Sequence, residues 1–205
     1  VPSNAAFATG TGDFTVEAWI FHNGAAPGGG VTNDRFIFGG FTTSPAQVFF
    51  LTNSSLAPAL WDGTTQYTAT TGITPNSWNH VAWVRASNTL TFYINGVSVG
   101  PTSSSITTNF TATRTSYIGR NDSTTDRYFP GYISNLRVVK GTAVYTSAFT
   151  PSRIPLTAVF GTSLLTAQDN AFKDDSSNAF AITPNGTPSI QSFSPFAPTV
   201  SYSTD

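Results

Sequence analysis

The fold is decided by SWNHVAWVR at positions 77–85 and LTFYINGV at positions 90–97, two runs rich in aromatic and β-branched residues. Asn95-Gly96 near the end of the second run supplies the two positive-φ positions that a type I′ turn requires. Residues 97–99 should therefore fold back as a third antiparallel strand. Alternation places Leu90, Phe92 and Ile94 on one face of the second strand. The first run has large residues on both faces, which is typical of a central strand covered on both sides.

The rest of the chain also shows strand patterns and no sustained helical period. The proline in 56–61 assigns that strand to a sheet edge or a bulge. We expect residues 101–113 to form a long surface loop with a weak strand and residues 144–149 to form a short helical or 3₁₀ turn. Strict alternation along 132–139 places Tyr132 and Leu136 on the same face. The remaining predicted strands are 14–21, 35–41, 47–51, 66–70, 116–119, 164–167 and 179–183.

The two central runs resemble the middle of laminin-G-like, concanavalin A-like domains, where Trp-His/Asn-His-Val-Ala precedes a strand ending in Tyr-x-Asp/Asn-Gly. Three further stretches follow in the order typical of that family: DFTVEAW at 13–19, YIGR at 117–120 and GYISNLR at 131–137. The resemblance covers roughly residues 1–155. It implies an all-β fold, a two-sheet antiparallel β-sandwich of the jelly-roll, concanavalin A-like type.

The later part of the chain, from Leu136 to Phe196, resembles a narrower group: laminin-G-like modules repeated in structural and tail-fibre proteins of bacteriophages, especially marine ones. We therefore expect a laminin-G-like sandwich over 1–155, strands that complete or flank it over 156–191, and a linker-like tail over 192–205. Laminin-G-like domains normally open with an additional strand before the equivalent of residues 1–3, and we expect this strand to be missing here. A missing first strand would leave an open sheet edge, which invites pairing with another chain.

Charge is sparse in this protein. Only 9% of its 205 residues are charged and the net charge is −1, whereas ordinary soluble domains have ~25% charged residues. The sequence therefore gives no electrostatic basis for binding nucleic acid or an anionic membrane. No apolar run approaches the ~20 residues of a membrane helix. Because cysteine is absent, disulfides and thiolate metal sites are excluded.

The acidic residues do not support hydrolytic chemistry. Glycanases of concanavalin A-like fold need two or three carboxylates on one strand, but Glu17 is the sole glutamate and no two acids stand at strand spacing. We expect Glu17 to be satisfied by an arginine or by backbone donors, and His80 to be a hydrogen-bonded core residue. No Gly-x-Ser-x-Gly or other nucleophile signature occurs. The sequence therefore predicts a protein that is not an enzyme.

A sugar-binding site needs an exposed aromatic ring beside planar hydrogen-bonding groups, because a sugar ring presents C–H faces and equatorial hydroxyls. Trp61-Asp62 at a strand end has this form, and two polar stretches offer partners. An aromatic residue in a β-sandwich is more often part of the core, which is the alternative for each ring. The candidate carbohydrate-binding residues are Trp61, Asp62, Arg120, Asn121, Arg127 and Tyr128.

A calcium ion is the one metal for which the sequence offers a candidate cluster, formed by Asn121, Asp122 and Asp126. Such sites need several converging carboxylates and carbonyls. Laminin-G-like domains often hold one calcium at a loop rim, partly through an acidic turn in the opening strand, which this chain lacks. The alternative is that these side chains form Asx-turns with their own backbone.

These observations predict a non-enzymatic virion module, in a tail fibre or on the capsid surface, located on the virion or outside the cell. Its expected partners are host-surface glycans or polysaccharide, other virion subunits, and further copies of itself in a homo-oligomer. No nucleic acid or membrane partner is expected. The alternative is a purely structural subunit of an extracellular filament or array, in which edge strands pair with neighbouring subunits.

Overall fold

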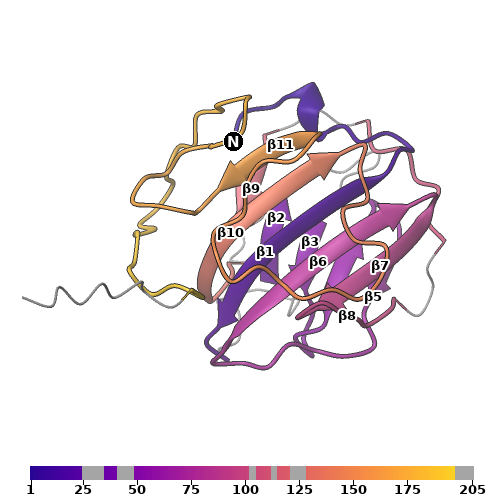
Figure 1. The fold of residues 1–205 in the computed structure, drawn as a ribbon, viewed down its shortest axis with the longest axis horizontal. Helices are drawn as coiled ribbons and strands as arrows, with labels where there is room; N and C mark the ends of the chain where they lie inside the picture. Colours follow the sequence, from indigo (N-terminus) through magenta and orange to yellow (C-terminus); the bar gives the residue numbers. More distant parts are fainter. Residues whose placement is uncertain (25–34, 41–48, 102–104, 112–114, 121–127, 197–205) are drawn as a thin grey trace, which may run out of the picture.

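The computed structural model describes residues 1–24, 35–40, 49–101, 105–111, 115–120 and 128–196. Two antiparallel sheets lie face to face in these residues (Figure 1). The larger sheet has the strand order β11-β10-β1-β6-β7-β8, and the smaller has the order β5-β4-β3-β2-β9. This arrangement confirms the predicted all-β sandwich.

Most of the predicted strands are present, but their first and last residues differ from the predicted ones. A single 3₁₀ turn, η1 (Ala5–Phe7), precedes the first strand in the described part of the chain. The strands are β1 (Phe14–His22), β2 (Arg35–Gly39), β3 (Phe49–Thr52), β4 (Pro58–Trp61), β5 (Gln66–Thr68), β6 (Trp78–Ala86), β7 (Thr89–Ile94), β8 (Val97–Ser98), β9 (Tyr117–Ile118), β10 (Gly131–Lys140) and β11 (Thr162–Thr166).

The central meander forms as predicted. Asn95 and Gly96 have φ angles of 50° and 80°, the left-handed values of the expected tight turn between β7 and β8. The polar break between β6 and β7 uses the same device, because Ser87 and Asn88 have φ angles of 47° and 65°. β6 lies inside its sheet between β1 and β7, as the large residues on both of its faces indicated.

Trp83 links the two sheets at the centre of the core. Its side chain on β6 is fully buried and its ring lies 5.6 Å from that of Phe50 on β3. Its indole N–H donates a 2.9 Å hydrogen bond to the carbonyl oxygen of Ala59 on β4. One side chain therefore contributes both apolar burial and a polar bond between the layers. The core also contains Phe14, Val16, Ala18, Ile20, Ile37, Phe38, Leu60, Val81, Leu90, Phe92, Leu136, Val138 and Leu164.

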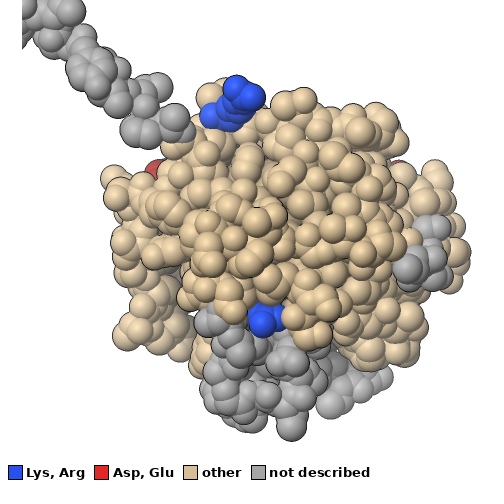
Figure 2. Space-filling view, turned by 90° about the horizontal axis from the view of Figure 1, so that it is seen from below, with Lys and Arg blue, Asp and Glu red and all other residues tan. Residues whose placement is uncertain are grey.

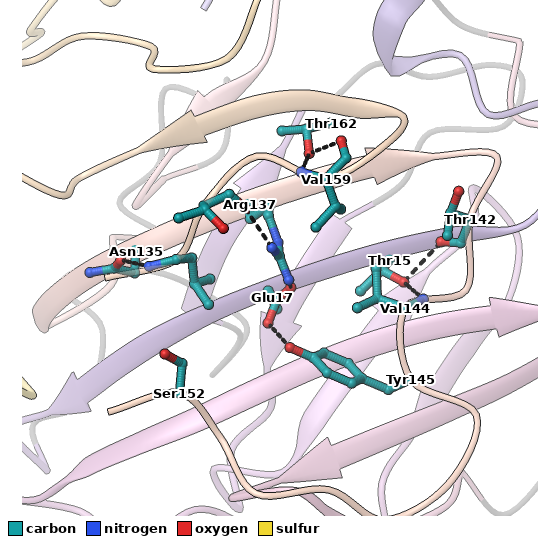
Figure 3. Close-up of polar contacts among 12 residues, drawn as sticks. Thr15, Glu17, Asn135, Arg137, Thr142, Val144, Tyr145, Ser152, Val159 and Thr162 are labelled. Atoms are coloured by element: carbon teal, nitrogen blue, oxygen red, sulfur yellow. Dashed lines mark hydrogen bonds and ion pairs between the residues drawn. The ribbon is translucent and has the colours of Figure 1, made fainter. Parts of the chain in front are cut away.

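The outer face of the six-stranded sheet is crossed by a segment that we call the strap, residues 141–151 (Figure 1). The predicted helical turn at 144–149 is wrong, since this segment is irregular and forms no helix. Its polar groups bond to the sheet: the Thr15 hydroxyl donates to the carbonyl of Thr142 at 3.0 Å and accepts from the N–H of Val144 at 2.8 Å (Figure 3). Tyr145 and Phe149 pack on the sheet beneath.

Within the predicted loop at 101–113, the described residues 105–111 contain two isolated β-bridges and no strand, but the segment does not lie wholly on the surface. Ile106 and Phe110 are completely buried in the main core. Buried Arg85 holds this segment, because its guanidinium donates to the carbonyls of Gly12 and Thr108 and lies 5.1 Å from the Phe110 ring. The segment closes one end of the sandwich.

Strict alternation fails in β10 at a bulge. Glu17 on β1 pairs with Arg137 but Trp19 pairs with Ser134, so β10 has one extra residue there. Asn135 lies at this bulge and has a left-handed φ of 52°. Leu136 therefore faces the core while Tyr132 faces outward, and the prediction that they share a face is wrong.

Two further strand predictions need correction. The prediction that the proline-containing strand lies at a sheet edge or a bulge is wrong, since β4 lies between β3 and β5. Pro58 is the first residue of β4, a position at which proline is tolerated inside a sheet. Residues 179–183 form one isolated bridge, between Lys173 and Ala181, and no strand. The Asp174 carboxylate caps this region by accepting from the N–H groups of Leu165 and Phe180.

β11, from the segment after residue 155, pairs with β10. The predicted domain division and the missing first strand stay predictions.

Candidate functional site

The outer face of the five-stranded sheet carries a row of residues in register across all of its strands. Tyr117 on β9 pairs with Gly39 on β2, Gly39 pairs with Phe49 on β3, Phe49 pairs with Trp61 on β4, and Trp61 pairs with Gln66 on β5. We call this set the outer row. The adjacent residues Ile118, Phe38, Phe50 and Leu60 point into the core, so Tyr117 and Trp61 point away from it.

Trp61 is half-buried and rests on Phe36 and Ala59, which form a small apolar cluster on the outer face. This support fixes one side of the indole. The sequence prediction placed Trp61 at an exposed strand end, and the structure places it on the surface of a sheet beside other strands. A ring held in this way can present a flat apolar face to a ligand.

Arg120 lies between two aromatic rings at the β9 end of the outer row. Its guanidinium carbon is 5.5 Å from the ring centre of Tyr117 and 5.6 Å from that of Tyr128. Cation–π contacts of this kind hold a guanidinium in place. Tyr128 is about half exposed, at 49%. The structure therefore places Arg120 and Tyr128 of the candidate set in contact, together with Tyr117, which the sequence analysis did not name.

Asp62 has a structural role in its own turn. Its carboxylate accepts hydrogen bonds from the N–H groups of Thr64 and Thr65 at 2.9 and 2.7 Å and from the Thr108 hydroxyl at 2.6 Å. Burial would raise the pKa of Asp62, but these hydrogen bonds outweigh it and lower the pKa. The side chain is 3% exposed, so we leave it out of the contact set proposed below.

The remaining predicted site residues lie outside the described part of the chain. They are Asn121 and Arg127 of the sugar-binding set, and Asn121, Asp122 and Asp126 of the calcium set. In the described residues, no group of three or more His, Cys, Asp or Glu side chains could hold a metal ion. The calcium site stays a prediction.

Glu17 lies in a buried polar cluster on the opposite sheet, beneath the strap (Figure 3). Its Oε1 accepts from Nε and Nη2 of Arg137 at 2.8 and 2.5 Å. Its Oε2 lies 3.0 Å from Nε2 of His80 and accepts from the Tyr145 hydroxyl at 2.7 Å. The expectation that an arginine satisfies Glu17 and that His80 is a hydrogen-bonded core residue is confirmed.

The partners of Glu17 keep its carboxylate ionised although it is buried. Burial alone would raise the pKa of Glu17, but the His80 hydrogen bond and the Arg137 charge outweigh it and lower the pKa. Burial, followed by the Glu17 charge, raises the pKa of Tyr145. With every member completely or largely buried, a substrate cannot reach the carboxylate. The cluster joins the strap to the sheet.

We expect protonation of His22 to destabilise the fold. The Gly24 N–H donates to Nδ1 of His22 at 2.9 Å, so this nitrogen must be unprotonated. Burial, and then the nearby Arg35 charge, lowers the pKa of His22 from 6.5 to about 4. His22 therefore takes up its proton at a higher pH in the unfolded chain than in the folded one. The contribution of neutral His22 to the free energy of unfolding is fully present above pH 6.5 and is lost as the pH falls toward 4. Thermal unfolding of the wild type and of His22→Gln between pH 7 and 4 checks this.

In that comparison the substituted glutamine side chain can accept the same N–H but does not titrate. The variant should therefore lose less stability than the wild type as the pH falls. Equal losses in the two proteins would show that His22 is not responsible.

The surface of the molecule reflects the low number of charged residues in the sequence. Figure 2 shows a face on which very few charged side chains appear among the described residues. No helix in the described residues is both long and apolar enough to cross a membrane.

Comparison with known proteins places this geometry in a family. Residues 1–154 match a family model described as the concanavalin A-like lectin/glucanases superfamily. A search of curated protein sequences finds no match.

Three solved structures show the same fold. A proposed carbohydrate-binding protein from Bacteroides ovatus has 19% sequence identity and a TM-score of 0.61; the alignment covers 85% of this chain and 52% of that one. Domain 4 of the extracellular arabinanase AbnA from Geobacillus stearothermophilus, in complex with arabinotriose, has 21% identity and a TM-score of 0.50, with coverages of 70% and 66%.

The third is the CBM40 module of the Ruminococcus gnavus IT-sialidase bound to α2,3-sialyllactose, with 10% identity, a TM-score of 0.53 and coverages of 69% and 82%. This chain spans about half the length of the Bacteroides ovatus protein. Since the family model matches most of the chain, this protein belongs to the concanavalin A-like lectin/glucanase superfamily.

Proposed function

We propose that this protein is a non-enzymatic carbohydrate-binding module that contacts glycans through Trp61, Tyr117, Arg120 and Tyr128. The observation that carries the proposal is the outer row, which places Trp61 and Tyr117 in one register across the sheet. Arg120, which lies between two tyrosine rings, adds a positively charged group at one end.

The row suits an extended sugar chain better than a single ring. Trp61 and Tyr117 are separated by three strand spacings, or roughly 14 Å. The partner of Tyr117 on β2 is Gly39, which has no side chain at this position of the row. A sugar could therefore stack on Trp61 while another contacts the Arg120 guanidinium near Tyr117. The arabinotriose and sialyllactose complexes support a role of this kind for the fold.

The absence of catalysis is part of the proposal. The only glutamate is sealed beneath the strap by Arg137, His80 and Tyr145, and retaining or inverting glycosidases need two accessible carboxyl groups. Asp62 and Asp174 are buried and accept hydrogen bonds from backbone N–H groups. Incubation with any polysaccharide that binds should release no new reducing ends.

The setting we propose follows the resemblance of residues 136–196 to bacteriophage modules. The protein would be exposed on a virion, in a tail fibre or as a capsid decoration, and would attach to glycans of the host surface. Its neutral surface, rich in Thr, Ser and Asn, suits recognition by neutral hydroxyl and amide groups more than electrostatic steering.

We expect Trp61→Ala to weaken glycan binding about tenfold or more, because removal of an aromatic anchor commonly costs ~2 kcal/mol of binding free energy. A glycan array followed by titration calorimetry with the best ligand measures this. Tyr128→Ala should weaken binding by a smaller factor, since the ring acts mainly by holding Arg120.

The matched control is Val97→Ala, which shortens an exposed side chain at the edge of the other sheet. This variant should bind like the wild type. Wild-type affinity in Trp61→Ala would contradict the proposed face, and a wild-type protein that binds no sugar on the array would contradict the function.

A further inference from the structure

The six-stranded sheet carries a second aromatic site, on the part of its outer face that the strap does not cover. Trp78 on β6 pairs with Phe21 on β1, and Phe21 pairs with Tyr132 on β10. The Phe21 ring centre lies 5.8 Å from that of Trp78 and 5.8 Å from that of Tyr132, at interplanar angles of 65° and 71°. Trp19 lies in the next outward-facing position of β1. We call these four residues the socket.

The socket is occupied by two phenylalanines from the end of the described chain. The Phe193 ring centre lies 4.9 Å from that of Phe21, 5.3 Å from that of Trp78 and 5.1 Å from that of Tyr132. Phe196 lies 6.0 Å from Trp19 in an edge-to-face contact. We call Phe193 and Phe196 the plug. The Phe193 ring meets those of Phe21, Trp78 and Tyr132 at interplanar angles of 82°, 34° and 67°. Such inclined rings suit a phenyl ring, whereas a sugar would need a flat plate.

The two covers of this sheet face are attached very differently. The strap is held by hydrogen bonds to Thr15 and Glu17 and by the N–H of Phe149, which donates to the Gly96 carbonyl at 3.0 Å. In the described residues, segment 183–196 makes hydrogen bonds only within itself, such as Gln191 to Ser189 and the Phe196 N–H to Ser194. In the described residues, the plug is joined to the sheet by ring contacts and not by hydrogen bonds.

The seated plug also leaves polar groups of the socket unsatisfied. The indole nitrogens of Trp19 and Trp78 are buried and have no hydrogen-bond acceptor in the described structure. A buried donor without an acceptor destabilises the state that buries it. Phe193 itself remains 46% exposed. The unsatisfied donors and the exposure of Phe193 both limit the stability of the seated arrangement.

The segment that carries the plug has the reach to leave its own socket. Ile182 is the last residue before the plug that packs against the core, and residues 183–192 are all exposed. A flexible tether of this kind holds its end near the socket at a local concentration in the millimolar range. A second copy of the chain at a similar concentration would offer the same plug, with the same contacts.

We propose that the socket and the plug are exchangeable between copies of this protein, so that Phe193 and Phe196 of one copy seat in the socket of another. The occupant is a second copy, and the interaction lies on the sheet opposite the proposed sugar-binding face. It is independent of the glycan proposal and differs from the pairing of edge strands considered for a filament.

Sedimentation velocity over a concentration series up to ~1 mM tests the exchange. The wild type should be monomeric at low concentration and form dimers or longer species as its concentration approaches the millimolar range. The double variant Phe193→Ser with Phe196→Ser should remain monomeric throughout. Phe172→Ser, which removes another exposed phenylalanine, should associate like the wild type. A monomeric wild type at every concentration, or equal association of the double variant, would overturn the proposal.

A peptide of residues 187–196 tests the socket directly. It should bind the folded double variant, whose socket is empty, at least tenfold more tightly than it binds the wild type, whose socket is filled in cis. The signals of Trp19 and Trp78 should report that binding. A peptide with serine at both phenylalanine positions should not bind. Absence of binding to the double variant would overturn the proposal whatever the outcome of the glycan array.

Discussion

Replacement of Glu17 by glutamine should lower the free energy of unfolding by about 3–5 kcal/mol, because breaking a buried ion pair leaves an uncompensated charge. The charge left behind is that of Arg137, which is 4% exposed and also donates to the Thr157 carbonyl at 2.7 Å. The Tyr145 hydroxyl would lose a charged acceptor at the same time. Urea unfolding followed by circular dichroism measures the loss.

The control for this prediction removes both charges. Glu17→Gln combined with Arg137→Gln should be less destabilised than the sum of the two single variants, since neither charge is then left alone. Fully additive losses would show that the pair is not coupled.

The pH dependence gives a second reading of the same cluster. Because the pKa of Glu17 lies below its ordinary value of 4.5, its contribution is present above that pH and is lost as the pH falls through the folded-state pKa. The wild type should therefore lose more stability than Glu17→Gln on acidification below about pH 4.5.

Trp83→Ala should lower the free energy of unfolding by about 3–5 kcal/mol, the usual range for a fully buried tryptophan. The indole is completely buried and contacts the Phe50 ring across the core. Its loss also removes the hydrogen bond to the Ala59 carbonyl that joins the layers. Thermal and urea unfolding measure the change.

Trp83→Phe separates the two contributions. It keeps most of the apolar volume and removes only the N–H donor, so it should lose about 1–3 kcal/mol, the usual penalty for a buried acceptor left without its partner. If Trp83→Phe were as unstable as Trp83→Ala, the apolar ring would contribute little, and the proposed role of Trp83 at the core would be wrong.

The elements that were predictable from sequence are those in which local and global preferences agree. The meander from Trp78 to Ser98 combines alternation, β-branched residues and an Asn-Gly turn, and all three indicate the same hairpins. Glu17 was interpretable because a lone carboxylate in an apolar strand must find a partner. The identity of that partner as Arg137 depended on strand pairing over a long sequence distance.

The failures have physical causes in particular residues. Ile106 and Phe110 were read as loop because their neighbours are Thr, Ser and Asn; long-range contacts with buried Arg85 anchor the segment instead. The bulge at Asn135 shifts the alternation of β10 by one residue, and a bulge of this kind has no periodic signal. The strap reads as a helical turn locally, but its polar groups find partners on the sheet.

The candidate site was predictable only in part. Trp61, Arg120 and Tyr128 were chosen from their residue types, and the structure shows that Arg120 and Tyr128 are in contact. Tyr117 was missed, although alternation could have identified it. Its neighbour Ile118 faces the core, so Tyr117 must face outward. Asp62 was chosen from its position beside Trp61, but turn geometry directs its carboxylate to Thr64, Thr65 and Thr108.

The central claim is that glycans bind on the outer row through Trp61. The four tryptophans of this protein give four indole N–H signals in a ¹H–¹⁵N correlation spectrum, each assignable by a Trp→Phe variant. Titration with the best ligand from the array should shift the Trp61 signal and leave that of buried Trp83 in place. Binding that shifts the Trp19 or Trp78 signal and leaves the Trp61 signal unmoved would contradict the account.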